Sequence, residues 1–375
     1  LKHAAPRLLI CQFDRREGHG YKQLKGYRRL CEETGAECEL EVVVESLVAF
    51  DVELANVAGW VRDAGLKLSA VAICPVGDLK SVLPGGVRPA APPLAELYRA
   101  ARKAFPGVRL GGGMFSFFTE LNRKRPPAEW LDFVHNGTCP IVHAADDRSV
   151  METHEALPFQ VQTARSFIGK TGYRIGPSAI GCRDNPHGKT FTPNPRNERL
   201  CLVNSDPRQR GLFGAAWTLG YVASLAATGV ETVCFGAPTG PLGIIHRPGD
   251  SKLPYFDAPG RGIAVYPAYH VVAGLARAAG AALVDAKSTD DARVRCLAWR
   301  AEGATLLWLA NVSAQAQSVS VAHAGKAAFG IVLDEAGFDE AATRPAEFEA
   351  NVKPLDTGKL ALDAYAVALV CINDR

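Results

Sequence analysis

The sequence predicts a (β/α)8 TIM barrel of the α/β class followed by a smaller antiparallel β domain. Short apolar segments of strand length alternate with amphipathic segments of helix length over residues 1–290, a pattern typical of parallel βαβ units. No glycine-rich dinucleotide fingerprint follows the first strand, which favours a barrel over an open nucleotide-binding sheet. After residue 290 the strands alternate apolar and polar residues, as in a solvent-facing antiparallel sheet. We therefore expect a catalytic barrel at 1–290 and a β-sandwich-like domain at 291–375.

Seven strands are expected in the barrel, whereas a closed barrel of this type has eight. The segments that predict them are residues 8–13, 39–44, 70–75, 108–110, 131–134, 173–180 and 232–235. Two interpretations of the eighth strand remain open: it is residues 200–203, or it is the first strand and precedes Leu1. The segments between the strands predict helices at residues 21–34, 52–64, 94–104 and 210–228.

The second domain is expected to be a small antiparallel sandwich. Its predicted strands are residues 294–299, 305–312, 318–322, 329–334 and 365–372, separated by Gly, Asn and Asp turns. No cluster of chemically reactive side chains lies in this part of the sequence, so we expect it to stabilise the barrel.

The composition argues against several classes of partner. The net charge is only +3 and no run of Lys or Arg occurs, which argues against a nucleic-acid partner. No apolar stretch reaches the roughly 18 residues that span a bilayer, and the start of the chain lacks the layout of a signal peptide. The ten cysteines are scattered without a C-x-x-C motif, which predicts reduced thiols in a cytoplasmic protein without a disulfide framework or zinc site.

The first candidate catalytic segment follows three consecutive glycines, Gly111 to Gly113. Glu120, Asn122 and Arg123 come within ten residues of them, among aromatic side chains. Reacting groups of barrel enzymes come from the carboxyl ends of strands and the loops after them. A carboxylate in a partly apolar pocket there is suited to proton transfer. The alternative is a surface loop in which Glu120 and Arg123 pair at i,i+3.

His143 and Asp147 form a second candidate pair, shortly after the strand that ends near His135. The two side chains are expected to orient one another as a catalytic pair or to bind substrate hydroxyls. In the alternative interpretation, Asp146 or Asp147 caps the helix that begins there.

Arg183 and Asn185 follow the strand at residues 173–180. A guanidinium at the rim of a barrel can polarise a carbonyl or hold a carboxylate, and the alternative is an ordinary loop salt bridge. Asp206 precedes a proline, and helix capping is favoured for it over catalysis.

The layout resembles the clan of (β/α)8 glycoside hydrolases that carry an appended β-sandwich. Residues 94–113 look like one barrel helix of that clan and the strand after it. In that clan the preceding strand ends in an Asn-Glu pair, whereas residues 74–78 read Cys-Pro-Val-Gly-Asp. The strand that should present the nucleophilic Glu reads Ile-Gly-Pro-Ser at residues 175–178. The two carboxylates needed for retaining glycoside cleavage are therefore missing from these strand ends.

The sequence is more similar to the D-apionate lactonase family, whose barrels look like those hydrolases. The resemblance rests on the Gly-Gly-Gly strand with Phe-Thr-Glu-Leu-Asn-Arg-Lys-Arg-Pro-Pro at 118–127 and on Pro-x-Val-His-Ala-x-Asp-Asp at 140–147. It continues with Arg-x-Asn-Pro at 183–186 and with the segment 206–220. One departure is Ala237, since the family pattern has an acidic residue at the end of that strand.

The resemblance implies a hydrolase that opens a sugar-acid lactone, D-apionolactone-like, to the aldonate in carbohydrate catabolism. It implies no metal and no cofactor, and its partner is a small sugar lactone or sugar acid. In this interpretation a base activates water and cationic or amide groups stabilise the oxyanion and the carboxylate product. The expected catalytic residues are Glu120 first and Asp147 or His143 second, with Asn122, Arg123, Arg183, Asn185 and His135 as substrate-binding residues.

Two other functions remain open at this point. A divergent glycoside hydrolase would use Glu120 with Asp206 or Asp147. A barrel that binds sugar without catalysis would fit the alanine at position 237.

Overall fold

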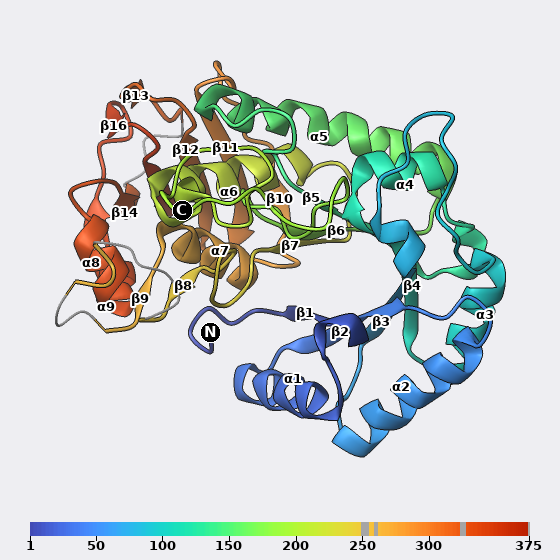
Figure 1. Cartoon of the computed structure of the whole chain (residues 1–375). Coiled ribbons are helices and arrows are strands. Elements are labelled where there is room, and N and C mark those ends of the chain that lie inside the picture. Colours follow the sequence, from blue (N-terminus) through green and yellow to red (C-terminus); the bar gives the residue numbers. More distant parts are fainter. Residues whose placement is uncertain (249–254, 259–261, 323–327, 374–375) are drawn as a thin grey trace.

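The computed structural model describes residues 1–248, 255–258, 262–322 and 328–373. Seven parallel strands form one sheet in which every strand pairs with its neighbours in chain order (Figure 1). They are β1 (Leu8–Phe13), β2 (Glu37–Val44), β3 (Ala70–Pro75), β4 (Arg109–Phe117), β5 (Phe133–Thr138), β6 (Gly172–Ser178) and β7 (Thr232–Phe235). The sheet curls until β1 approaches β7, which confirms the predicted barrel.

Helices cover the outside of this barrel. They are α1 (Tyr21–Thr34), α2 (Phe50–Ala64), α3 (Leu94–Ala104), α4 (Phe118–Lys124), α5 (Asp147–Ile168), α6 (Leu212–Leu225) and α7 (Pro267–Arg277). Single 3-10 turns follow the strands or precede the helices at η1 (Arg15–Glu17), η2 (Val76–Leu79), η3 (Ala128–Trp130) and η4 (Pro207–Arg210). In the described residues, no helix is both long and apolar enough to cross a membrane.

The prediction of an eighth strand at residues 200–203 is wrong. Residues 201–202 form a turn, and Leu202 has a φ of 55°, which no strand residue adopts. The N–H of Leu202 donates to the carbonyl of Ile141 at 2.9 Å. The apolar residues of this segment therefore anchor the long loop after β6 to the loop after β5.

The C-terminal residues form the predicted antiparallel β domain. One sheet has the order β10-β11-β12-β17-β14-β15, and β13 pairs with β16. The strands are β10 (Leu283–Val284), β11 (Val294–Ala301), β12 (Ala304–Asn311), β13 (Gln317–Val319), β14 (Ala328–Leu333), β15 (Lys353–Pro354), β16 (Leu360–Leu362) and β17 (Val367–Asn373). Two short helices that the sequence analysis did not predict, α8 (Phe338–Thr343) and α9 (Pro345–Ala350), lie between β14 and β15. In a separate two-stranded sheet, β8 (Ile245–His246) pairs antiparallel with β9 (Ala264–Val265).

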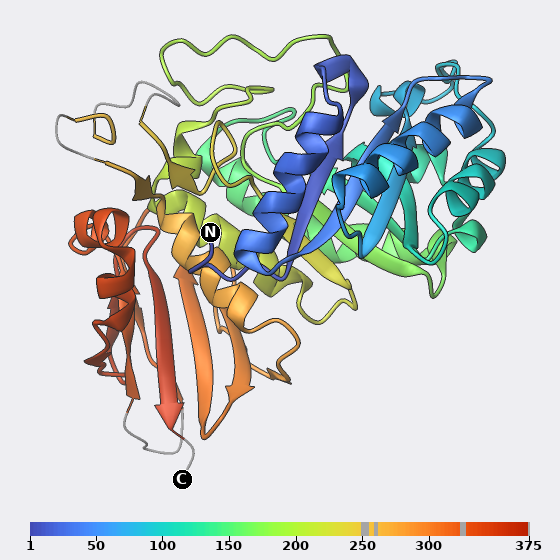
Figure 2. The ribbon, with the colours of Figure 1, turned by 90° about the horizontal axis from the view of Figure 1, so that it is seen from below.

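The antiparallel sheet packs against the side of the barrel that carries α6 and α7 (Figure 2). Trp308 of β12 lies where a Cβ on Gly274 of α7 would be only 2.5 Å from its ring. His270 of α7 faces the carboxylate of Glu349 and the carbonyl of Ala341. The two domains therefore share both apolar packing and buried polar contacts.

The three glycines at residues 111–113 lie within β4 rather than after it. A Cβ on Gly111 would meet the Phe133 ring at 2.2 Å, and one on Gly112 would meet the Tyr98 hydroxyl at 2.6 Å. Gly113 has a φ of +132° and lies against the carbonyl of His135. Because glycine has no side chain, β4 can approach β5 closely at these positions, and large rings can pack on both faces of the sheet.

The substitution Gly113→Ala is expected to destabilise the protein by roughly 3 kcal/mol or more, because it combines a strained φ with a backbone clash. The matched control is Gly26→Ala on the exposed face of α1, where a Cβ meets nothing within 4 Å. That change should stabilise the helix by up to about 1 kcal/mol. Urea unfolding of both variants measures the two effects, and equal stabilities would contradict the packing described for β4.

Candidate active site

Two carboxylates project from β2 into the barrel interior. Glu39 and Glu41 are both fully buried and alternate with Leu40 and Val42 of the outer core, as the two-residue period of a strand requires. A buried carboxylate needs a charged or hydrogen-bonded partner. Each of these two carboxylates has an arginine as its charged partner.

Glu39 pairs with Arg174 of β6 at 2.5 Å. Arg174 also contacts Glu231 at 2.7 Å, and its guanidinium lies 4.0 Å from the centre of the Phe133 ring. Glu41 pairs with Arg183, which comes from the loop after β6 and spans the barrel to reach it. Arg183 remains partly exposed, so it forms the floor of the barrel mouth.

His135 of β5 lies between the two carboxylates. Its Nδ1 is 3.8 Å from an oxygen of Glu39 and 3.6 Å from one of Glu41. Neither ring nitrogen has a hydrogen-bond partner in the described structure, and the same is true of Oε1 of Glu39. These polar atoms can therefore hydrogen-bond a substrate or a water molecule.

Burial shifts the pKa values of two groups in this cluster in opposite directions. It raises the pKa of the Glu39 carboxyl to about 7 and lowers the pKa of the His135 imidazole to about 4. A carboxyl and an imidazole whose pKa values are shifted by burial inside a barrel are typical of a functional site.

Further charged side chains follow the ends of other barrel strands. Asp14, at the end of β1, holds Arg16 through two hydrogen bonds of 2.9 and 2.5 Å. Lys80, from the loop after β3, lies 3.7 Å from Asp184. Charged groups thus follow the carboxyl ends of three different strands, which is the edge where barrel enzymes place their reacting groups.

Glu120 lies in the first turn of α4, outside this cluster. It is 2% exposed and accepts hydrogen bonds from the hydroxyl of Ser81 at 2.7 Å and the N–H of Val82 at 3.1 Å. Arg123 donates to it at 3.1 Å, and the ammonium of Lys124 lies 3.7 Å away. The carboxylate thus fastens the loop after β3 to α4, and its role as the base stays a prediction.

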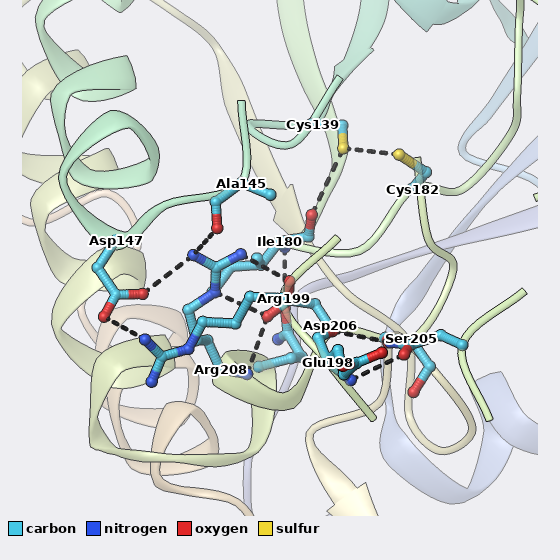
Figure 3. Close-up of polar contacts among 12 residues, drawn as sticks. Cys139, Ala145, Asp147, Ile180, Cys182, Glu198, Arg199, Ser205, Asp206 and Arg208 are labelled. Atoms are coloured by element: carbon cyan, nitrogen blue, oxygen red, sulfur yellow. Dashed lines mark hydrogen bonds and ion pairs between the residues drawn. The ribbon is translucent and has the colours of Figure 1, made fainter. Parts of the chain in front are cut away.

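Asp147 is held by two arginines, Arg199 at 2.9 Å and Arg208 at 3.1 Å (Figure 3). Arg208 in turn binds Asp206, which caps η4 as predicted. Asp146, not Asp147, caps α5 through the N–H of Ser149.

His143 is exposed, and its ring centre lies 6.0 Å from that of His187. No hydrogen bond joins His143 to Asp147 within the described ranges. The structure therefore does not bring these two predicted catalytic residues together as a pair.

The other predicted binding residues mainly shape loops. Asn122 accepts from Arg125 at 3.0 Å, and Arg123 donates to the carbonyl of Val82. Asn185 accepts from the N–H groups of His187 and Gly188. Of the predicted set, His135 and Arg183 both contact Glu41, and Glu120 and Arg123 pair with each other outside this cluster.

Glu39, Glu41 and Arg174 were missed by the sequence analysis. The available signal is the sequence Glu-Cys-Glu-Leu-Glu-Val-Val-Val at residues 37–44, where charged residues occupy alternate positions of an otherwise apolar strand. In a barrel strand with a buried outer face, such residues have to point inward. No group of three or more His, Cys, Asp or Glu that could hold a metal ion occurs in the part of the chain that the structure describes.

Comparison with known proteins assigns both domains. The family model described as the D-apionate lactonase TIM barrel domain matches residues 1–280. The model described as the C-terminal immunoglobulin-like domain of D-apionate lactonase matches residues 291–370. The chain belongs to the D-apionate lactonase family. A curated D-apionate lactonase of Brucella anthropi is 37% identical over 326 residues, which cover 87% of this chain and 52% of that protein.

This chain thus spans about half the length of the curated family member that it matches. Solved structures with the same fold are much more distant in sequence. A family 51 alpha-L-arabinofuranosidase from Bifidobacterium longum has a TM-score of 0.59 at 15% identity, over 99% of this chain and 88% of that one. A family 30 xylanase from Clostridium acetobutylicum has a TM-score of 0.57 at 10% identity, over 99% and 90%. These likenesses show that this chain shares its fold with these two glycoside hydrolases.

The buried cluster of this D-apionate lactonase family member predicts a specific pH dependence of stability. The raised pKa of Glu39 means that the folded state holds the extra proton between about pH 4.5 and 7, so the contribution of Glu39 falls as pH rises. The lowered pKa of His135 means that the unfolded state holds the extra proton between about pH 4 and 6.5, so the contribution of His135 falls as pH drops. The two contributions oppose each other.

In Glu39→Gln only the histidine contribution remains. Relative to the parent, the free energy of unfolding of this variant should decrease by about 2 kcal/mol as the pH falls from 6.5 to 4.5. Urea unfolding at a series of pH values measures this. Glu33→Gln, on the exposed face of α1, is the control. Its free energy of unfolding should change with pH in the same way as that of the parent. Parallel curves for Glu39→Gln would refute the buried titration.

Proposed function

We propose that this chain opens a sugar-acid lactone, D-apionolactone-like, to the aldonate without a metal ion. The observation that carries the proposal is the cluster of Arg183, Glu41 and His135 in the interior and mouth of a barrel that belongs to the D-apionate lactonase family. Carbohydrate catabolism in the cytoplasm is the proposed setting.

The reaction needs two kinds of group. Attack of water on the lactone carbonyl requires a base, and the negative charge that develops on the carbonyl oxygen requires a cation or hydrogen-bond donors. Arg183 is the partly exposed cation of the cluster, and its pairing with Glu41 holds the guanidinium in place. We assign it to the carbonyl oxygen and then to the product carboxylate.

His135 is the proposed base. Its lowered pKa keeps the imidazole neutral at pH 7, so a ring nitrogen can accept a proton from the attacking water. Glu41 at 3.6 Å stabilises the imidazolium that results. The proton then passes to the alkoxide of the opened ring, which completes the hydrolysis.

The assignment of the base to Glu120, with Asp147 or His143 second, remains a competing proposal within the same function. Asn122, Arg123 and Asn185 would then bind the substrate together with Arg183. The geometry favours His135, because Glu120 and Asp147 already accept from several donors each.

A retaining glycosidase mechanism is less well supported. Such enzymes place two free carboxyl groups about 5 Å apart, whereas Glu39 and Glu41 are each paired with an arginine. Release of an aryl alcohol from an aryl glycoside would favour a divergent glycoside hydrolase. Thermal stabilisation by a sugar acid without turnover would favour a sugar-binding barrel.

Substitution Arg183→Met should lower kcat/KM for lactone opening by roughly 100- to 1000-fold, as loss of an oxyanion-stabilising group does in other enzymes. Carboxylate release from D-apionolactone in a pH-stat measures the rate, and thermal unfolding confirms that the variant is folded. Arg148→Met is the matched control, because among the described residues the ion-pair partner of this arginine is Glu152, on the exposed face of α5. Wild-type rates in Arg183→Met would sink the proposal.

Glu120→Gln separates the two assignments of the base. If the carboxylate only fastens the loop after β3 to α4, the main effect is a lower Tm. The uncharged amide accepts hydrogen bonds from the charged donors more weakly than the carboxylate does, so the free energy of unfolding falls by about 1–3 kcal/mol. We expect this result, with the turnover rate of the folded enzyme within about tenfold of the parent rate. If turnover instead falls by about 100-fold or more at unchanged Tm, Glu120 is the base.

A further inference from the structure

Two thiols lie in contact beside the proposed active site. Cys139 directly follows β5 and Cys182 lies in the loop after β6, and both are free cysteines. Their sulfur atoms are 3.0 Å apart (Figure 3). Cys139 is partly exposed, whereas Cys182 is buried. Neither thiol has a role in the proposed lactone opening, yet Cys182 directly precedes Arg183 in the sequence.

The backbone holds the two thiols near this separation. Thr138, which precedes Cys139, is paired with Ser178 across β5 and β6, and their hydroxyl groups are hydrogen-bonded at 2.8 Å. In the loop after β6, the carbonyl of Cys182 accepts a hydrogen bond from the side chain of Asn204 at 2.9 Å. A disulfide bond is about 2.05 Å long, so the sulfurs have to approach each other by only about 1 Å to form one.

We propose that Cys139 and Cys182 form a reversible disulfide in the presence of a peroxide, and that this bond switches the active site off by displacing Arg183. Because Arg183 follows Cys182 directly, a shift of Cys182 toward Cys139 is transmitted to the guanidinium that pairs with Glu41. A misplacement of about 1 Å in a reacting site can cost about 100-fold in rate. The disulfide rests on the positions of the two thiols, whereas its effect on turnover rests on the proposed lactonase function.

The reaction balances with hydrogen peroxide as the oxidant. The thiolate of Cys139, the more exposed of the two, attacks one peroxide oxygen, the O–O bond breaks, and a sulfenic acid and hydroxide form. The thiolate of Cys182 then attacks the sulfenic sulfur, the S–O bond breaks, and a second hydroxide leaves as the S–S bond forms. The two thiol protons convert the hydroxides to water. The sulfurs together lose two electrons, which reduce the peroxide, and a dithiol reductant reverses the oxidation.

The rate of this oxidation depends on how readily Cys139 loses its proton. Burial raises the pKa of the Cys139 thiol. Because the thiolate is the reacting form, the first step is slow at neutral pH. The pair is therefore suited to sustained exposure to peroxide rather than to a brief pulse, and oxidation has to be followed over time.

Peptide mapping tests whether the disulfide forms. The chain is incubated with hydrogen peroxide, free thiols are alkylated at successive times, and the peptides are mapped by mass spectrometry without reduction. The expected result is a cross-linked peptide that joins Cys139 to Cys182, accumulates in most molecules and disappears after treatment with dithiothreitol. Absence of this peptide, or oxidation of Cys139 to a sulfinic acid without it, would overturn the proposal.

The rate of lactone opening in the same samples tests the switch. We expect kcat/KM of the parent to fall by about tenfold or more as the disulfide accumulates, and to recover with dithiothreitol. Cys139→Ser should keep the parent rate and resist this reversible loss, and Cys139→Ala is the second variant in case the first does not fold. The matched control is Cys31→Ser, because Cys31 of α1 is also partly exposed and interacts with two other thiols, those of Cys11 and Cys38. This control should be inactivated like the parent.

Reversible inactivation that persists in Cys139→Ser, or that is lost in Cys31→Ser, would overturn the proposal, because another thiol would then be responsible. Hydrogen exchange in residues 183–188 reports on the Arg183 loop without turnover and should increase when the disulfide forms. A mapped disulfide with unchanged exchange and unchanged rate would overturn the switch. If the reduced chain opens no lactone, the lactonase proposal fails, and the peptide map and hydrogen exchange still decide this one.

Discussion

Arg183 reaches across the barrel to Glu41, and this ion pair determines what the barrel mouth can do. The loop after β6 supplies the guanidinium and β2 supplies the carboxylate, so the pair ties the floor of the mouth to a rigid strand. Removing one partner of a buried pair leaves an unpaired charge and typically costs about 3–5 kcal/mol. The conformation of the loop and the position of the cation are therefore coupled.

A second buried ion pair, between Arg174 and Glu39, lies below the pair of Arg183 and Glu41. Arg174 pairs with Glu39 and Glu231 and stacks on the ring of Phe133. Phe133 fits in the interior only because Gly111 lacks a side chain. The glycine run of β4 is thus tied to the site through packing: it makes space for the ring that supports the arginine that neutralises Glu39. This explains why so small a residue recurs in the middle of a barrel strand.

The sequence predicts the architecture better than the site, and the reason is physical. Strand and helix periodicities are local, so the barrel, four of its helices and the antiparallel domain could be inferred from spacing. The partners of a carboxylate are not local: Ser81, which binds Glu120, lies 39 residues away, and Arg183, which binds Glu41, lies 142 residues away. Glu120 was therefore interpreted as a free acid at a strand end. Glu41 was not recognised as a candidate because it lies within an otherwise apolar strand. The apolar residues 200–203 similarly resembled a strand, although they anchor a loop.

The fold is shared with glycoside hydrolases, but the arrangement of charge suits a different bond. Cleavage of an acetal needs an acid for the leaving oxygen and a free carboxylate close to the anomeric carbon. Opening of a lactone develops negative charge on a carbonyl oxygen, which a cation stabilises and a carboxylate would repel. In this barrel the interior carboxylates are neutralised by arginines, and the cation is the group that meets the mouth. This pairing of charges supports the proposed attack on an ester carbonyl rather than on a glycosidic bond, in a barrel that shares its fold with glycoside hydrolases.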